Sequence, residues 1–475
     1  MYLTRYKNSS FLLKNGAAES IRALYHTKWY RLIFAKQFEW RHKQKSKKET
    51  EMKKVNTRKL VAVIAAAAAS ALVLAGCGST ASDSSSEHTT ITFSYLWTGE
   101  EAKALKSVVN DFNKSQSKIT VKAVSNPDQT KQLTSMSSTN GSFDVSDSFG
   151  SNVGSWASKG ILEPLDNYGF DTSDFIPSVL KQDTYKGKLY AMPIAVQEYK
   201  LLYNKDEFKA AGITTTPKTM DELATDIAKL TKQDSNGTIT QLGLGTSSAY
   251  NLLSTLAYVF GGSWDGNSKP TPLNKGNIAA LNWYKTNLLD KYGASNIAKF
   301  EAGYGSYMSS EDPFYTGKIA MTIDGEWQSA NISKVAPKLN WGVIDIPAVS
   351  SKLTNATHTY SSMFFIPTNS KHKTEAATFI KYLTGKKAMR TFTKALGNLP
   401  ARTSLLDDSA YDSLPGFDVW LQGLKSKNTF SFAPTTYTSQ YQTDLTSAFS
   451  DFVLGKTTAK EALTTVEKKA ASYDN

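Results

Sequence analysis

The pattern of apolar and polar residues after about residue 89 predicts strands and helices that alternate along the chain. Residues 92–96 and 119–123 alternate with the period of two that a strand requires. Between them, Thr98 to Glu101 has the form of a capping box, and the apolar residues that follow repeat with helical spacing. A strand, a helix and a second strand in this order indicate a wound α/β sheet.

The same alternation continues to the end of the chain. A second capping box at Thr219 to Glu222 predicts another helix. We expect further helices at 128–138, 153–159, 374–383 and 458–471, and further strands at 143–146, 189–196, 200–203, 318–323 and 363–366. The sequence shows no internal repeat of the period that solenoid proteins have.

A different pattern precedes residue 89. An uncharged run over residues 60–74 follows four basic residues and ends in Leu74-Ala75-Gly76-Cys77. This order is typical of a secretory signal, and the run is shorter than the ~20 apolar residues that a membrane-spanning helix needs. The last four residues resemble the bacterial lipobox, which implies that Cys77 is acylated and becomes the first mature residue. Cys77 is also the only cysteine, so the mature protein has no intramolecular disulfide.

The residues around the signal divide into three parts. Residues 1–51 carry 12 Lys or Arg, an unusual preface to a signal sequence, and we expect translation to begin at Met52. Residues 52–76 then form a lipoprotein signal peptide. Residues 77–88 form a lipidated cysteine and a flexible linker, because Ser, Gly, Thr and Asp cannot bury enough surface to fold.

Charge excludes several classes of partner. The whole chain has a formal charge of +13, but residues 77–475 carry 39 basic and 38 acidic side chains, so the exported body is nearly neutral. Nucleic acid is therefore not expected as a partner. Only Arg390 and Arg402 are arginines in this body, which disfavours a polyanionic ligand. The three histidines of the body have no metal-ligand spacing and no phosphate-binding glycine loop is present, so we expect neither a metal nor a cofactor.

Several short motifs occur in a fixed order through the body and resemble one protein family. These motifs are residues 160–166, 191–197, 202–206, 211–213, 217–223, 317–321, 325–327 and 398–402. The ordered set resembles the extracellular sugar-binding proteins of ABC importers, the group that includes maltose-binding protein. The resemblance covers essentially everything from residue 89 onward.

The resemblance implies a two-lobed α/β fold of the periplasmic-binding-protein (Venus flytrap) type, in which each lobe is a wound α/β sheet and crossing hinge strands join the lobes. We expect lobe 1 at 89–197 plus 360–412, and lobe 2 at 198–359 plus 413–475. The family closes its lobes around a ligand and delivers it to membrane permease subunits powered by a separate ATPase. With the lipid on Cys77, the protein would be a monomer anchored on the outer face of a Gram-positive type of cell membrane.

Sugar recognition needs flat aromatic faces for the C–H side of the ring and fixed polar groups for the hydroxyl rim, because an unpartnered buried hydroxyl costs roughly 1 to 3 kcal/mol. In wound sheets such groups lie at the carboxyl ends of strands. This rule and the resemblance select ligand-binding candidates in or near lobe 1: Trp97, Glu100, Asp147, Ser148, Gln197, Glu198, Ser361, Met363 and Arg402. In lobe 2 they select Trp264, Tyr304, Asp324, Glu326 and Trp327.

Three choices among these candidates stay open. Gln197 stands where the family carries a glutamate and Glu198 follows it, so either residue can be the one that contacts ligand. Trp264 lies in a glycine-rich loop that we expect outside the core. Arg402 can bond a sugar hydroxyl or pair with a nearby carboxylate.

Two other functions also fit the sequence. A glycoside hydrolase needs a pair of carboxylic acids, and Asp324 with Glu326, or Asp147 with Glu198, offers one. A hydrolase does not need two lobes that close around a sugar, nor does it need to release that sugar to a permease. We therefore expect a binding protein and no enzyme. A lipid-anchored sensor or adhesin on the same fold is the remaining alternative.

Overall fold

The computed structural model describes residues 88–245, 248–266 and 269–473. The predicted extension, the signal peptide, Cys77 and the linker up to residue 87 lie outside the described residues, as does the side chain of Glu100. Within the described ranges, none of the helices combines the length and the apolar character that a membrane span needs.

Two long strands lie at the centre of an eleven-stranded sheet in the described part of the chain. The order along the sheet is β2-β1-β3-β13-β6-β11-β8-β7, with β12 and β14 on β6 and β15 on β13. The strands are β1 (Thr89–Tyr95), β2 (Ile119–Ser125), β3 (Val145–Phe149), β6 (Ala191–Asn204), β7 (Lys232–Gln233), β8 (Ile239–Gly245), β11 (Ile319–Gly325), β12 (Trp341–Ile344), β13 (Thr357–Phe365), β14 (Leu399–Pro400) and β15 (Thr429–Phe430). Two short hairpins stand apart from it: β4 (Thr184–Tyr185) with β5 (Lys188–Leu189), and β9 (Asp265–Gly266) with β10 (Lys269–Pro270).

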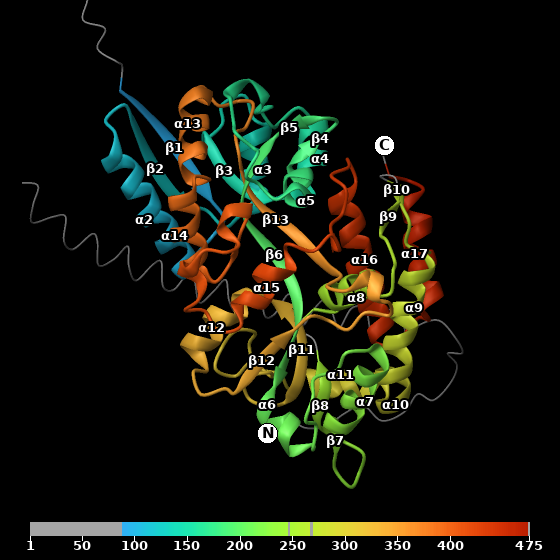
Figure 1. Cartoon of the computed structure of the whole chain (residues 1–475). Helices are drawn as coiled ribbons and strands as arrows, with labels where there is room; N and C mark the ends of the chain where they lie inside the picture. The colour runs from blue at the N-terminus through green and yellow to red at the C-terminus, as the bar shows by residue number, and fades with distance from the viewer. Residues whose placement is uncertain (1–87, 246–247, 267–268, 474–475) are drawn as a thin grey trace, which may run out of the picture. The chain divides into compact units, whose positions relative to one another are not determined.

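Helices surround this sheet, and many of them belong to two packed groups (Figure 1). The helices are α2 (Gly99–Ser115), α3 (Gln129–Ser137), α4 (Val153–Ser158), α5 (Pro177–Leu180), α6 (Lys205–Ala210), α7 (Met220–Leu230), α8 (Ala249–Val259), α9 (Lys275–Tyr284), α10 (Asp290–Tyr292), α11 (Ala294–Glu301), α12 (Trp327–Val335), α13 (Lys373–Leu383), α14 (Lys386–Leu396), α15 (Phe417–Gly423), α16 (Thr438–Val453) and α17 (Ala459–Ala470). Helices α2, α13 and α14 pack together beside β1 and β2. Helices α8, α9, α16 and α17 form a second group, in which α8 contacts β11 and β13.

Strand β6 joins the two halves of the sheet. Its first part pairs with β13, ending with Glu198 opposite Thr359. Its second part pairs with β11 and β12, beginning with Tyr199 opposite Gly325. Figure 1 shows β6 passing from the half that contains β1 and β3 to the half that contains β8 and β11. The change of partner falls one residue after the predicted lobe boundary at residue 197, and the lobe assignment itself stays a prediction.

Most predicted elements are present, and three differ in detail. The capping box at Thr219 is confirmed, with hydrogen bonds in both directions between Thr219 and Glu222. The one predicted at Thr98 is wrong: Thr98 precedes α2, but its side chain makes no capping hydrogen bond, and Gly99 has a φ of 58°. The strand predicted at 143–146 is β3, two residues later.

The two strands predicted at 189–196 and 200–203 are one continuous strand, β6. The prediction divided it because Gln197, Glu198 and Lys200 interrupt the apolar pattern. These polar residues are tolerated in a central strand because Glu198 and Lys200 pair with each other.

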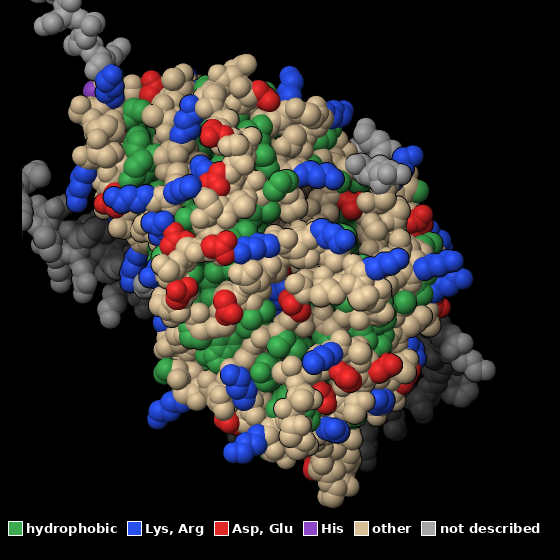
Figure 2. Space-filling model, viewed as in Figure 1, with side chains coloured by type: hydrophobic (Ala, Val, Ile, Leu, Met, Phe, Trp, Pro, Cys, Tyr) green, Lys and Arg blue, Asp and Glu red, His purple; other side chains and the backbone are tan. Residues whose placement is uncertain are grey.

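The surface agrees with the near-neutral charge of the body. On the face shown in Figure 2, basic and acidic side chains are interspersed between uncharged ones. The rings of Phe93, Phe364 and Phe379 meet below this surface with centroids 5.4 to 5.6 Å apart. Such burial of apolar surface is the main stabilising contribution to a fold without disulfides.

Candidate functional site

Strand β6 presents two different faces where the halves of the sheet meet, because successive side chains of a strand point in opposite directions. Glu198 and Lys200 share one face, where they are fully buried and their charged atoms lie 2.9 Å apart. Lys200 also pairs with Asp345. Helix α15 covers this face so closely that a Cβ atom on Gly423 would lie 2.2 Å from a Glu198 oxygen. Burial raises the pKa of Glu198, and the Lys200 ammonium opposes that rise.

The other face of β6 carries Gln197 and Tyr199 and meets a set of aromatic rings. The Tyr199 ring stands perpendicular to the Trp327 ring at 5.9 Å and nearly perpendicular to the Tyr360 ring at 6.2 Å. The Tyr360 hydroxyl donates a hydrogen bond to the Tyr250 hydroxyl at 3.1 Å. We call Trp327, Tyr199, Tyr360 and Tyr250 the aromatic wall. All of them except Tyr199 keep part of their surface exposed.

Gln197 is the polar residue of β6 that lies beside this wall. It is directly opposite Tyr360 in the strand register and is partly exposed. The structure separates Gln197 from Glu198 by position, and which of the two contacts ligand stays a prediction. Only Gln197 shares a face with the wall, whereas Glu198 is held in the ion pair on the opposite face.

Trp327 lies where β11 ends and α12 begins, and three neighbours fix its ring. The indole lies over Gly325, where a Cβ atom would come within 2.1 Å of the ring. The indole Nε1–H donates to the Tyr307 hydroxyl at 2.7 Å, and the Tyr199 ring meets the indole at 90°. The Trp327 ring is thus fixed in position and partly exposed. Stacking on a sugar requires an aromatic ring of this type.

Asp324 supports this arrangement from inside the protein. It accepts hydrogen bonds from the Tyr307 hydroxyl, the Gly325 N–H and the Gln328 side-chain amide, each at 2.8 Å. Burial raises the pKa of Asp324 to about 6, and the three hydrogen bonds oppose that rise. At neutral pH the carboxylate is therefore mainly ionised and acts as an acceptor.

Glu326, like Asp324, is buried, although its place at the carboxyl end of β11 made it a candidate, and its contact with a ligand stays a prediction. It is fully buried, and it accepts hydrogen bonds from the Glu198 N–H and the Asn398 side-chain amide, both at 3.1 Å. Neighbouring side chains on a helix point about 100° apart, so the start of α12 directs the indole outward and the carboxyl group inward. Burial raises the pKa of Glu326 to about 8.

The candidates near β1 and β3 are partly or fully buried. Trp97 keeps part of its surface, and its ring packs against Phe364 and Phe392. Asp147 and Ser148 are buried in β3. Asp147 accepts from the Leu96 N–H at 2.7 Å, and burial raises its pKa to about 7. Ser148 accepts from the Asn152 side chain at 2.9 Å.

Trp264 and Met363 belong to the core, contrary to expectation. The Trp264 side chain has no exposed surface, and its indole donates to the Ser254 carbonyl at 3.1 Å. Its loop approaches α9 so closely that a Cβ atom on Gly262 would lie 2.2 Å from Asn277, and the ring turns inward. Met363 lies within β13 and is fully buried in a separate apolar cluster.

Of the remaining candidates, Ser361 and Arg402 have partners within the protein. Ser361 is buried and donates to Asp183 at 2.9 Å. Arg402 binds Asp174 and the Thr384 carbonyl and lies over the Phe175 ring, so it has the carboxylate partner that the sequence left open. The Tyr304 hydroxyl is buried without a hydrogen-bond partner. For all of these residues, contact with a ligand stays a prediction.

Sequence reasoning selected Trp327 but not the three tyrosines of the wall. Tyr199 was detectable, because it follows Gln197 by two residues in a strand and so shares its face. Tyr250 and Tyr360 carried no such signal: α8 and β13 bring them together across 110 residues of sequence.

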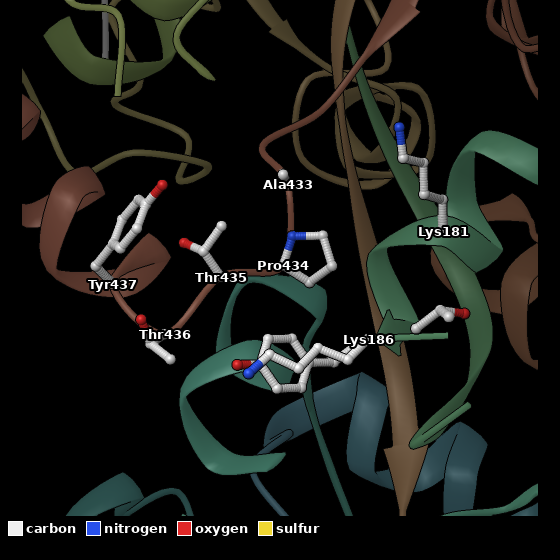
Figure 3. Close-up of a pocket in the computed structure, with 9 residues that line it drawn as sticks. Lys181, Lys186, Ala433, Pro434, Thr435, Thr436 and Tyr437 are labelled. Atoms are coloured by element: carbon white, nitrogen blue, oxygen red, sulfur yellow. The ribbon is translucent and has the colours of Figure 1, made fainter. Parts of the chain in front are cut away.

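Three surface hollows of about 490, 650 and 720 Å³ lie elsewhere, and none of the predicted ligand-binding residues lines them. Figure 3 shows the first, between the segment that carries Lys181 and Lys186 and the segment Ala433–Tyr437. Across the described ranges, no group of three or more His, Cys, Asp or Glu side chains is arranged to hold a metal ion.

Comparison with known proteins identifies the family. A family profile described as bacterial extracellular solute-binding protein matches residues 107–419. A protein of Brucella abortus, named as a binding protein, is 32% identical over 263 residues, which span 51% of this chain and 58% of the relative's own length. The multiple sugar-binding protein of Streptococcus mutans is 25% identical over 373 residues, covering 74% of this chain and 87% of that protein.

Solved structures agree with this match. The structure of CpMnBP1 with mannobiose bound is 30% identical, has a TM-score of 0.69, and is aligned over 81% of this chain and 100% of that protein. The maltose-binding-like architecture of the solved neighbours shows that the fold is the two-lobed α/β fold that the sequence predicted. This chain belongs to the family of bacterial extracellular solute-binding proteins.

Proposed function

We propose that the protein captures a neutral oligosaccharide between its two lobes and delivers it to the permease of an ABC importer. The observation that carries this proposal is the aromatic wall on one face of the crossing strand β6. Partly exposed rings of Trp327, Tyr360 and Tyr250 offer stacking surfaces for the C–H faces of sugar rings. Gln197 beside them offers an amide for hydroxyl groups.

The charges near the wall favour an uncharged solute. Lys200 lies on the opposite face of β6 in its ion pair, and Arg402 is bound to Asp174. Recognition of an anionic solute normally uses such cations. A wall of several rings also offers more than one stacking surface, which favours a chain of sugar units over a single one.

Relatives support a sugar as the solute. One relative is the maltotriose-binding protein of Pyrococcus abyssi, and two solved structures 30% identical to this chain hold mannobiose and mannotriose. The manno-oligosaccharides are therefore the first probes to use.

Calorimetric titration of the purified protein tests the proposal. Mannobiose, mannotriose and maltotriose are the probes, and we expect saturable binding of at least one. Trp327→Ala should weaken that binding by about 1 to 3 kcal/mol, by analogy with aromatic stacking on other ring ligands. Trp283→Ala, which removes a ring on α9 outside the wall, is the matched control. Absence of binding by every probe, or equal affinity of Trp327→Ala and the wild type, would contradict the proposal.

We propose further that the bound sugar is not cleaved. Glu326 has both carboxyl oxygens engaged by internal donors, and Asp324 accepts three internal hydrogen bonds, so neither is free to act as a glycosidase acid or nucleophile. Chromatography of the probes after long incubation with the protein should show no products. Shorter sugars in the wild-type sample would reverse this conclusion.

The lipid on Cys77 and the transport role belong to the same proposal, with the body acting as a monomer. Cys77→Ser should release the protein from the membrane into the medium of the native host, and mass spectrometry of the wild type should find a diacylglyceryl group on this residue. Deleting the gene should abolish uptake of the bound sugar. Normal uptake after deletion would favour the sensor or adhesin alternative.

A further inference from the structure

Tyr307 lies beside the aromatic wall, on the loop between α11 and β11, and the residue is 43% exposed. We propose that Tyr307 is a positioning residue: its hydroxyl holds the Trp327 indole in the orientation that solute stacking requires. This inference rests on the proposed function and deepens it, because it names a determinant of affinity that acts through another side chain.

The hydrogen bonds around Tyr307 permit only one direction of donation. The indole Nε1 of Trp327 can only donate, so the Tyr307 oxygen accepts from it at 2.7 Å. The Tyr307 proton is then free to donate to Asp324 at 2.8 Å. An ionised Asp324 can only accept, and it closes the chain. The donations thus run in one order, from indole to phenol to carboxylate, and the Gln328 amide also donates to the Tyr307 oxygen at 3.4 Å.

The loop itself is held in the shape that presents this hydroxyl. Met308, the next residue, has a φ of 60°, a conformation that residues with a side chain rarely adopt. The Met308 N–H donates to Asp312 at 2.8 Å, and the Asn331 amide donates to the Met308 carbonyl at 3.0 Å. Asn331 lies on α12, the helix that begins with Trp327. The loop and the indole are thus tied to the same element.

The two other neighbours of the indole do not replace the hydroxyl. Gly325 lies against the ring and Tyr199 meets it at a right angle, and both contacts are apolar. In the described part of the chain, Tyr307 is the single hydrogen-bond partner of the Trp327 Nε1. Without the hydroxyl, the ring loses the contact that sets its rotation over Gly325.

Tyr307→Phe tests the inference, because it removes only the hydroxyl oxygen. The whole protein is labelled with 5-fluorotryptophan, and Trp327→Phe identifies the Trp327 resonance in the fluorine spectrum. In the solute-free protein, Tyr307→Phe should shift and broaden this resonance and leave the others in place. Calorimetry with mannotriose should show roughly tenfold weaker binding, because the indole is no longer held in the stacking orientation. The unfolding midpoint should fall only slightly, because Asp324 keeps its hydrogen bonds from Gly325 and Gln328.

Tyr168→Phe is the matched control: its hydroxyl donates to Glu163 at the surface, and its loss should change neither the Trp327 resonance nor the affinity. An unchanged Trp327 resonance in Tyr307→Phe overturns the inference, even if affinity falls, because Tyr307 would then contact the solute directly. A shifted resonance with unchanged affinity overturns it as well. If the wild type binds no sugar, the proposed function fails, while the resonance of the solute-free protein still decides whether Tyr307 fixes the ring.

Discussion

Asp147 shows how a single buried carboxyl group links stability to pH. It is 3% exposed, and burial raises its pKa to about 7. Because this pKa exceeds the unfolded value of about 3.9, the folded state binds the proton more tightly than the unfolded state does. Its contribution to stability is therefore complete below about pH 4 and is lost as the pH rises through about 7.

Asp147→Asn should remove this loss, because the amide cannot ionise and still accepts from the Leu96 N–H. Between pH 5 and pH 8 the wild type should lose roughly 1 to 3 kcal/mol more of its unfolding free energy than the variant does. Urea unfolding at a series of pH values measures the difference. Asp412→Asn, at an exposed position, is the control. Parallel pH curves for Asp147→Asn and the wild type would show that Asp147 does not titrate in this range.

Single residues were predictable from sequence where the local pattern fixed their direction. Trp327 follows a strand end, and its partial exposure agrees with that position. Trp264 has a similar local setting, a loop rich in glycine, yet its ring is buried because the loop packs on α9. Nothing in the nearby sequence distinguishes the two, since the difference arises from a helix that begins at residue 275.

Among the elements, β6 combines a central position with a buried ion pair between Glu198 and Lys200. The free energy of unfolding of the protein should depend on both of these side chains. Lys200→Met leaves Glu198 buried without its cation, which typically costs about 3 to 5 kcal/mol. The double variant Glu198→Gln with Lys200→Met should lose less, because no fully buried charge is left without a partner and Asp345, the other partner of Lys200, is 37% exposed. Urea unfolding of the four proteins in this cycle measures the coupling. A single variant as stable as the double variant would show that the pair does not hold the strand.

Element boundaries followed the sequence where local chemistry decides them. Thr219 and Glu222 form their capping box because both partners lie within one helical turn. Thr98 fails to cap because Gly99 changes the backbone direction, a feature that the residue types alone do not reveal. The continuity of β6 depends on strands that come more than 100 residues later, so the local pattern could not establish it.

At the scale of the whole described body, helix α4 packs tightly against the segment before α16. The contact leaves no space for a methyl group on Gly154. A Cβ atom on Gly154 would lie 2.3 Å from the Thr435 carbonyl oxygen and 2.5 Å from that of Pro434. Ser439 adds hydrogen bonds to the Ser151 carbonyl and the Asn152 side chain. The contact joins parts of the chain that the sequence assigns to different lobes.

Gly154→Ala should therefore destabilise the protein by about 1 to 3 kcal/mol, although alanine favours a helix more than glycine does. Thermal unfolding measures the change, and Ser155→Ala in the same helix is the control for helix propensity. If Gly154→Ala were as stable as the control, the two segments would have room to separate at no cost.

The strand order also determines when this chain can fold. Strand β3 ends at Phe149, but its neighbour β13 begins only at Thr357, and β13 in turn lies against β6. A polypeptide that crosses a membrane amino end first would expose the edge of β3 until most of its length had emerged. Pairings so distant in sequence form slowly. The nascent protein would thus stay unfolded throughout translocation. An unfolded chain can pass through a narrow channel, but it is exposed to proteases and to aggregation until β13 has crossed the membrane.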